Sequence, residues 1–234
     1  MPDLTLSRLA GADPDVLRRS AADLGWHAAD LFVAAGLEVP DDLAPARSTI
    51  SREVGRLIVS MKNLQLEALD EIRAFIRSLP EHPPVAPGPE QVTAHVRVRP
   101  ASDGPGPMLV RLLANRNIRP WNARLLLWVG GGPYVSDSTI YQLGQCVVRV
   151  TGAYVTGFAH ILGIPAADLA ELTGVEPSDR NRTHPHSAEL AGLAWDARRL
   201  TTDQLLAVGR RADALTAADP RRYCSRCRGF HTRD

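Results

Sequence analysis

Residues 133–146 read PYVSDSTIYQLGQC, a stretch that predicts a short helix with a clear start. Ser136 suits the N-cap position because a serine hydroxyl can accept a hydrogen bond from the free amides of the first turn. Ile140 and Leu143 lie three residues apart and share one helical face. If this face is buried, the side chains that point outward are Ser138, Tyr141, Gln142 and Gln145. The exposed face is therefore uncharged, yet rich in hydrogen-bonding groups.

The segments around this stretch predict further helices and almost no strand. Apolar residues recur every three or four positions, and the period-two alternation of a half-buried strand is nearly absent. Pro120 suits the first turn of one predicted helix, and Gly163 suits the end of another. The five consecutive predicted helices cover residues 108–117, 119–129, 136–145, 151–163 and 165–174. We therefore expect an all-α protein.

Two motifs in these helices resemble those of a known family. VSDSTI at residues 135–140 opens the third predicted helix, and LGIP at residues 162–165 leads to Asp168 and Leu169. This order resembles the Xre (Cro/phage-repressor-like) family of helix-turn-helix transcriptional regulators over residues 108–174. The whole chain is similar to actinobacterial regulators that carry a segment like HAADLFVAAGLEVPDDLAP, which stands here at residues 27–45. The resemblance implies a five-helix domain whose third helix binds double-stranded DNA, commonly as a homodimer on paired half-sites.

The residue types in and near the third helix suit DNA recognition. Glutamine can form a bidentate contact with adenine, and serine or threonine can contact bases or phosphates. Residues 95–150 carry a local charge of +5, whereas residues 1–80 carry −3. Arginines beside the helix can therefore hold the phosphates while the helix itself stays uncharged. The candidate DNA contacts are Arg116, Arg119, Asn122, Arg124, Ser136, Ser138, Thr139, Tyr141, Gln142, Gln145 and Arg149.

Two features depart from the family pattern. WVGGGPYV, at residues 128–135, adds about five residues to the turn before the third helix. Its three glycines permit a wide loop and a displaced recognition helix. Asp137 complements the helix dipole but repels phosphate. The alternative function is a protein-interaction module that keeps a repressor-like fold without binding DNA.

The two halves of the chain resemble each other. Residues 24–42 and 162–179 share Leu-Gly, Ala-Ala-Asp-Leu and a later glycine, and residues 52–79 then align with 188–215 without a gap. We therefore predict an internal duplication. No counterpart of the third helix precedes the first copy, so we expect that copy to serve packing, dimerisation or ligand sensing.

A proline-rich stretch marks the main boundary. PEHPPVAPGPEQ, at residues 80–91, contains five prolines and should connect separate helical units. The predicted organisation is a helical unit at residues 1–80, a linker at 81–107, a helix-turn-helix domain with a C-terminal helical hairpin at 108–216, and a basic Cys/His tail at 217–234.

Composition favours a cytoplasmic protein. The 234 residues can bury one or two cores without a metal or disulfide. No run of 18 apolar residues exists, and the N-terminus lacks the basic start and apolar stretch of a signal peptide. We therefore expect no membrane association. The cysteines form no disulfide framework.

The tail contains a candidate zinc motif. Cys224, Cys227 and His231 follow the pattern C-x2-C-x3-H, which supplies three of the four ligands of a structural zinc site. The candidates for a fourth ligand are Cys146, His184 and His186, and a second subunit is a further possible source. The favoured interpretation is a basic tail with two free thiols, so we expect no cofactor, with zinc and a metal- or thiol-sensing regulator as alternatives.

We expect no enzymatic activity. VGGGPY, at residues 129–134, lacks the spacing and the lysine of a phosphate-binding loop. No Ser/His/Asp or paired-carboxylate motif stands out in the sequence.

Overall fold

The protein is built of helices, as the sequence predicts. A computed structural model describes residues 6, 9, 11–45, 52–80, 98–178, 183–218, 223–224 and 229–230. Its helices are α1 (Pro14–Ser20), α2 (Ala28–Ala34), α3 (Arg52–Met61), α4 (Leu66–Ser78), η3 (Ala101–Asp103, a 3-10 turn), α5 (Pro105–Ala114), α6 (Pro120–Val129), α7 (Asp137–Gly144), α8 (Gly152–Leu162), α9 (Ala166–Thr173), α10 (Ser187–Ala197) and α11 (Thr202–Ala218). Strands β1 (Tyr223–Cys224) and β2 (Gly229–Phe230) form only a short antiparallel pair. The all-α prediction is confirmed.

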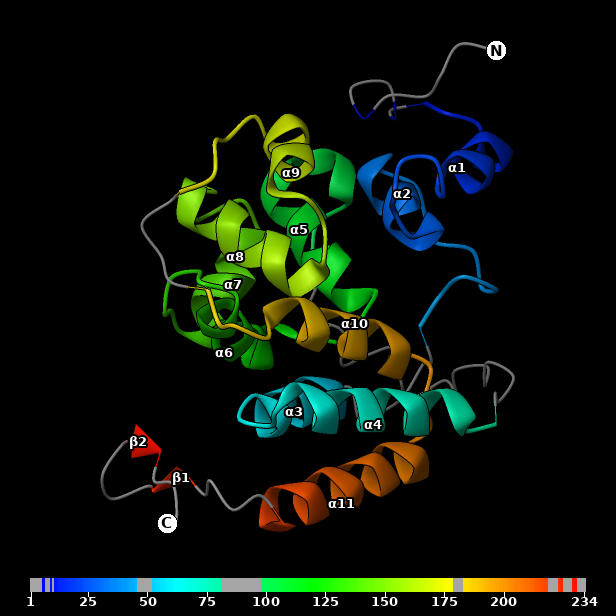
Figure 1. Cartoon of the computed structure of the whole chain (residues 1–234). Coiled ribbons are helices and arrows are strands. Elements are labelled where there is room, and N and C mark those ends of the chain that lie inside the picture. The colour runs from blue at the N-terminus through cyan, green and yellow to red at the C-terminus, as the bar shows by residue number, and fades with distance from the viewer. Residues whose placement is uncertain are drawn as a thin grey trace, which may run out of the picture.

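The helices of the two halves pack into each other. The α3–α4 hairpin lies between α10 and α11 (Figure 1), and both α3 and α4 contact both of those helices. Helix α3 also contacts α6, and α2 contacts α5. A single cluster of buried apolar side chains extends from Leu6 to Ala212 and includes residues from both sides of the proline-rich segment. The two halves therefore share one hydrophobic core among the described residues.

Helix α5 begins earlier than the sequence suggests. Residues 103–107, DGPGP, favour a break, yet Pro105 stands in the first turn of α5 after Gly104 at a φ of 145°. Proline is tolerated there because the first turn of a helix needs no amide donor. The last part of the expected linker is therefore helical.

The helix bounds of the two halves correspond closely. Helix α2 begins at Ala28 and α9 at Ala166, the first residues of the two Ala-Ala-Asp-Leu motifs. Gly25 and Gly163 precede these helices with the same left-handed φ of 67°. Apolar residues are buried at aligned positions in both hairpins: Val54/Leu190, Leu57/Leu193, Ile58/Ala194, Met61/Ala197, Leu64/Leu200, Leu69/Leu205, Ile72/Val208 and Ile76/Ala212. Equivalent positions therefore face the shared core.

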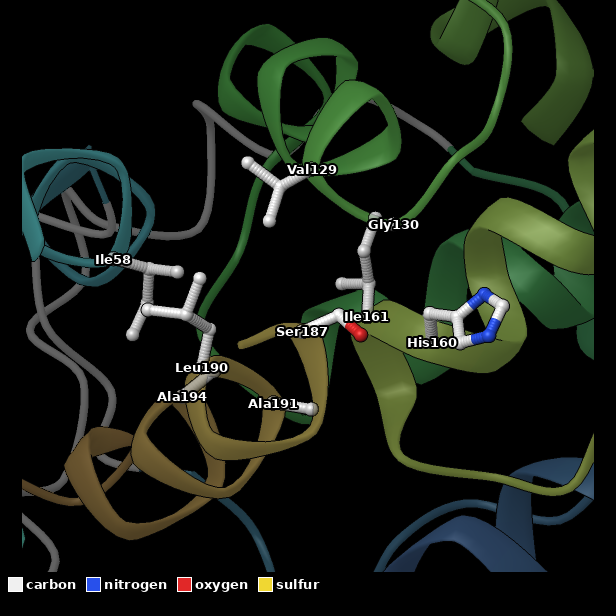
Figure 2. A pocket seen from close by; sticks show the side chains of 9 residues that line it. All are labelled: Ile58, Val129, Gly130, His160, Ile161, Ser187, Leu190, Ala191 and Ala194. Atoms are coloured by element: carbon white, nitrogen blue, oxygen red, sulfur yellow. The ribbon is translucent and has the colours of Figure 1, made fainter. Parts of the chain in front are cut away.

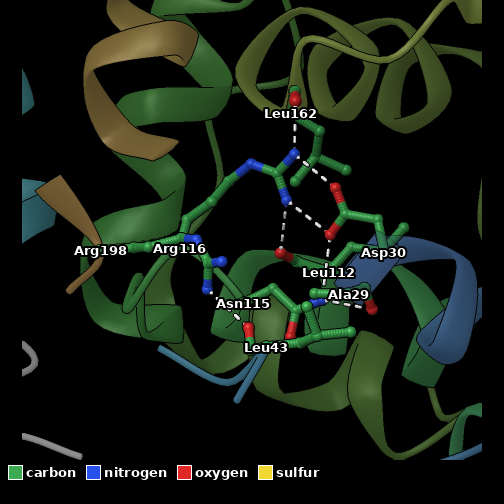
Figure 3. A network of polar contacts seen from close by, with 8 residues as sticks. All are labelled: Ala29, Asp30, Leu43, Leu112, Asn115, Arg116, Leu162 and Arg198. Carbon is green, nitrogen blue, oxygen red and sulfur yellow. Dashed lines mark hydrogen bonds and ion pairs between the residues drawn. The ribbon is translucent and has the colours of Figure 1, made fainter. Parts of the chain in front are cut away.

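A buried ion pair ties α2 to the residues that directly follow α5 (Figure 3). The carboxylate of Asp30 accepts hydrogen bonds from both terminal nitrogens of Arg116, at 3.0 and 2.8 Å, and from Asn115 Nδ2 at 3.0 Å. Arg116 also donates to the backbone oxygens of Leu112 and Leu162. Both charged side chains are fully buried. A buried charge without a partner is costly, so removing either residue of the pair should destabilise the protein.

No helix among the described residues is long and apolar enough to span a membrane.

Candidate nucleic-acid interface

Helix α7 has one buried and one exposed face, as its sequence predicts. Ile140 and Leu143 are fully buried, and the helix contacts α5 and α6. The close approach to α5 depends on Gly106, where a Cβ atom would lie 2.2 Å from the Leu143 carbonyl oxygen. Ser138, Tyr141 and Gln142 are exposed, while Thr139 and Gln145 are half-buried. The structure therefore presents an uncharged row of hydrogen-bonding side chains to solvent.

The start of α7 differs from the expected capped turn. Ser136 occupies the N-cap position but makes no side-chain hydrogen bond to the backbone of the helix. Its hydroxyl instead forms hydrogen bonds with the hydroxyls of Ser138, at 2.7 Å, and Thr139, at 2.9 Å. The prediction that Ser136 caps the amides is therefore wrong in this detail, because neighbouring hydroxyls compete for the same oxygen.

The wide turn before α7 is held against the rest of the protein. Helix α6 ends at Val129, and the next helix begins at Asp137. Gly132 packs on α8 so closely that a Cβ added to Gly157 would lie 2.6 Å from the Gly132 Cα atom. The backbone amide of His184 donates to the Val129 oxygen at 2.9 Å. The glycines of this turn thus support a defined loop, and α7 packs against both α5 and α6.

Two of the predicted DNA contacts are buried, and the prediction is wrong for both. Arg116 has no exposed surface because it forms the ion pair with Asp30. Asn122 is 8% exposed and faces α3, where a Cβ at Gly55 would lie 2.6 Å from the Asn122 Cβ atom. Both contacts involve elements of the first half of the chain, which local sequence patterns do not place.

The remaining predicted arginines differ in what they contact. The Arg124 Nε atom lies 3.0 Å from an Asp137 carboxylate oxygen, so it neutralises the acidic group at the start of α7. The Arg119 guanidinium lies over the Trp121 ring, 5.2 Å from its centroid. Arg149 is exposed just beyond the turn that ends α7.

Two arginines that were not among the predicted DNA contacts, Arg99 and Arg111, lie beside the C-terminal end of α7. The Arg99 amide donates to the Gly144 oxygen at 3.2 Å, and Arg111 Nε donates to the Arg99 oxygen at 2.8 Å. The Arg99 side chain is 55% exposed and also lies 3.8 Å from Asp103. The charge excess of residues 95–150 included both arginines, but the sequence did not show that residues 98–104 pass alongside α7.

Large apolar side chains are exposed around the same helix. Seven such residues are exposed in the described chain, and four lie between positions 128 and 147: Trp128 (53%), Tyr134 (68%), Tyr141 (39%) and Val147 (70%). Aromatic side chains of this kind are enriched where proteins bind partners.

The predicted zinc site lies partly outside the described residues, so it stays a prediction. Cys224 lies in β1, paired with Gly229, whereas Cys227 and His231 lie outside the described residues. Within the described ranges, no group of three or more His, Cys, Asp or Glu side chains is arranged to hold a metal ion. Cys146, a candidate fourth ligand, is exposed and donates only a long hydrogen bond, 3.8 Å, to the Asp103 oxygen.

A small cavity lies between α3, α8, α10 and the end of α6. Figure 2 shows Ile58, Val129, His160 and Leu190 among the residues around it. Its volume is about 10 Å³, room for one water molecule at most. This cavity is too small to bind an effector.

Comparison with models of protein families, with curated proteins and with solved structures finds no match for this chain.

Proposed function

We propose that the protein is a sequence-specific DNA-binding transcriptional regulator of the Xre type, in which α6 and α7 form the helix-turn-helix and α7 enters the major groove. The observation that supports this most is the exposed row Ser138, Tyr141 and Gln142 on a helix whose opposite face is buried. A helix in the major groove needs such short or amide-bearing side chains at base edges.

The charges around α7 suit a polyanion. Asp137 opposes phosphate, but Arg124 lies 3.0 Å away and offsets its charge. Arg99, Arg111 and Arg149 then surround the C-terminal end of the helix and replace the buried Arg116 as candidate phosphate contacts. These contacts supply affinity that does not depend on sequence, and Gln142 supplies base preference.

A homodimer on paired half-sites remains part of the proposal. The apolar faces of both hairpins are already covered within one chain, because α3–α4 packs between α10 and α11. A second copy would therefore have to bind a different surface. The role also keeps the cytoplasmic location that the sequence favours.

One observation supports a second candidate function, a protein-interaction module. The exposed side chains Trp128, Tyr134 and Val147 flank the face that would meet DNA. Aromatic anchors dominate many protein interfaces, whereas phosphate recognition needs cations.

Affinity for random-sequence duplex DNA, measured by fluorescence anisotropy at several salt concentrations, tests the proposal. Arg149→Ala should weaken binding to every duplex and flatten the slope of log affinity against log salt by about one unit. Arg210→Ala removes the same charge from an exposed position on α11 and should change little. Equal effects of both substitutions, or no DNA binding at all, would favour the protein-interaction module.

A further inference from the structure

A groove of about 310 Å³ lies where the ends of α4 and α10 meet the start of α11. Arg77 and Pro80 line one side, and Asp196, Arg198 and Arg199 line the other. This volume is within the range of small-molecule sites. Three guanidinium groups and one carboxylate give the groove an excess of positive charge.

Arg198 is the buried cation of this groove. The residue is only 7% exposed, and its guanidinium lies 3.9 Å from the centre of the Trp195 ring. The His27 ring also stacks on Trp195, with 3.5 Å between the ring centroids. Arg198 Nη1 donates to the Leu43 backbone oxygen at 2.9 Å (Figure 3). These contacts fix the position of the guanidinium.

Arg198 and Arg116 are both buried beside Trp195, but only Arg116 has a counter-ion. Arg116 takes both carboxylate oxygens of Asp30. Arg198 forms no ion pair with any acidic side chain of the described residues. Burial, together with Arg199 and Arg116, lowers the pKa of Arg198 to about 10, although Asp30 opposes this. A buried cation without a counter-ion is costly even when it is hydrogen-bonded, so a bound anion would stabilise it.

The acidic side chains in and beside the groove do not serve as a counter-ion for Arg198. The Asp196 carboxylate is already shared by Arg77, at 3.2 Å, and by Arg73, at 3.7 Å. Arg199 donates to the Asp42 backbone oxygen, while the Asp42 carboxylate is held by Arg18. Asp196, the carboxylate that lines the groove, and the nearby Asp42 carboxylate are therefore both already paired with arginines other than Arg198.

We propose that this groove binds a small oxyanion with two or more negative charges, of the phosphate or dicarboxylate type, held by Arg198 and Arg199 with Arg77 at its rim. The planar guanidinium fork matches the paired oxygens of both ligand types. The groove is on the α4–α10 side of the protein, so this site is independent of whether α7 binds DNA.

Calorimetric titration of the full chain with sodium phosphate, and separately with sodium succinate, tests the proposal against sodium chloride at equal ionic strength. We expect at least one of the two oxyanions to bind and chloride to give no comparable heat. Arg199→Gln and Arg77→Gln should each weaken binding about tenfold or more, because each loses a charge-assisted hydrogen bond. Which oxyanion binds more tightly identifies the ligand type.

The matched control is Arg210→Gln, which removes one charge from an exposed position on α11 outside the groove. It should bind the oxyanion like the wild type. Failure of both oxyanions to bind the wild type would overturn the proposal. Equal weakening by Arg210→Gln and Arg199→Gln would do so too, since the affinity would then reflect net charge alone.

Discussion

The segment from α1 to α4 and the segment from α8 to α11 follow the same order of helices, but they differ in what stands beside them. Helices α5–α7 precede the second segment and include the candidate DNA-reading helix. The first segment has no such addition and instead supplies α3–α4, which packs between α10 and α11. The two segments have related sequence patterns but different places in the structure. The first packs against the second, and the second directly follows the candidate DNA-binding helices.

The aspartates of the two Ala-Ala-Asp-Leu motifs show this difference at single residues. Asp30 is fully buried and holds Arg116 and Asn115. Asp168 is half-buried and accepts one hydrogen bond, from Trp26 Nε1 at 2.8 Å. Each aspartate therefore joins its own helix to the opposite half of the chain, but only Asp30 neutralises a buried charge. The internal duplication itself stays a prediction from the sequence.

The largest effect is expected from Asp30→Ala, with Asp168→Ala as its comparison in the other segment. Asp30→Ala leaves Arg116 buried without a counter-ion and should lower the free energy of unfolding by ~3–5 kcal/mol. Asp168→Ala removes a single hydrogen bond to Trp26 and should cost ~1–3 kcal/mol. Urea unfolding followed by circular dichroism measures both. Equal losses would show that the two motifs do not differ in role.

Aligned core leucines should behave alike. Leu57 and Leu193 are 5% and 0% exposed at matching positions of the two hairpins. Leu57→Ala and Leu193→Ala should each lower the free energy of unfolding by ~2–5 kcal/mol, because each leaves a cavity in the shared core. The same urea titration applies. A loss below 1 kcal/mol for only one of them would contradict the equivalence of the hairpins.

The paired left-handed glycines should show a smaller, matched effect. Gly25 and Gly163 both have a φ of 67°, and an added Cβ would meet no closer contact than 3.6 Å. Alanine at either position should therefore cost ~1–2 kcal/mol through backbone strain alone. Gly209→Ala in α11 is the control, since open space surrounds that helical position and alanine should stabilise it. A stabilising effect at either left-handed glycine would count against the correspondence.

The smallest expected effect is a pH dependence of stability caused by His27, which has no titratable counterpart in the second segment. Desolvation against Trp195, together with Arg116 and Arg198, lowers the pKa of His27 from 6.5 to about 4, although Asp30 and Asp196 oppose this. The unfolded chain therefore binds a proton that the folded protein does not, so stability should fall as pH drops from about 6.5 towards 4. Pro165 stands at the aligned position and does not titrate.

Comparison with His27→Gln isolates this effect. As the pH is lowered through that window, the unfolding free energy of the wild type should fall relative to that of His27→Gln. Because His27 also reaches solvent, the change should be modest. A difference that is constant with pH would show that His27 keeps its ordinary pKa.

Local sequence patterns predicted the parts of the structure that depend on local rules. The spacing of Ile140 and Leu143 identified the buried face of α7, and Gly163 marked the end of α8. The same patterns show which face of an amphipathic helix is buried but not which helix covers it. The insertion of α3–α4 between α10 and α11 therefore did not follow from them.

The errors at the candidate site have the same origin. Arg116 looked available for phosphate because its partner, Asp30, is 86 residues away in the sequence. Asn122 looked exposed because Gly55 of α3, which leaves room for it, belongs to the other half. Both residues would have been excluded only by knowing the long-range packing.

Selection of binding sites from randomised duplex DNA tests most directly whether α7 is the DNA-reading element. The wild-type chain should enrich one sequence. Gln142→Ala should lose preference at one base-pair position by ~1–3 kcal/mol while keeping the same salt dependence. Gln65→Ala makes the same change before α4, where the side chain caps nothing, and should select the wild-type sequence. A wild-type chain that enriches no sequence, or a Gln142→Ala variant that selects the same site with unchanged preference, would contradict the assignment of α7 as a recognition helix.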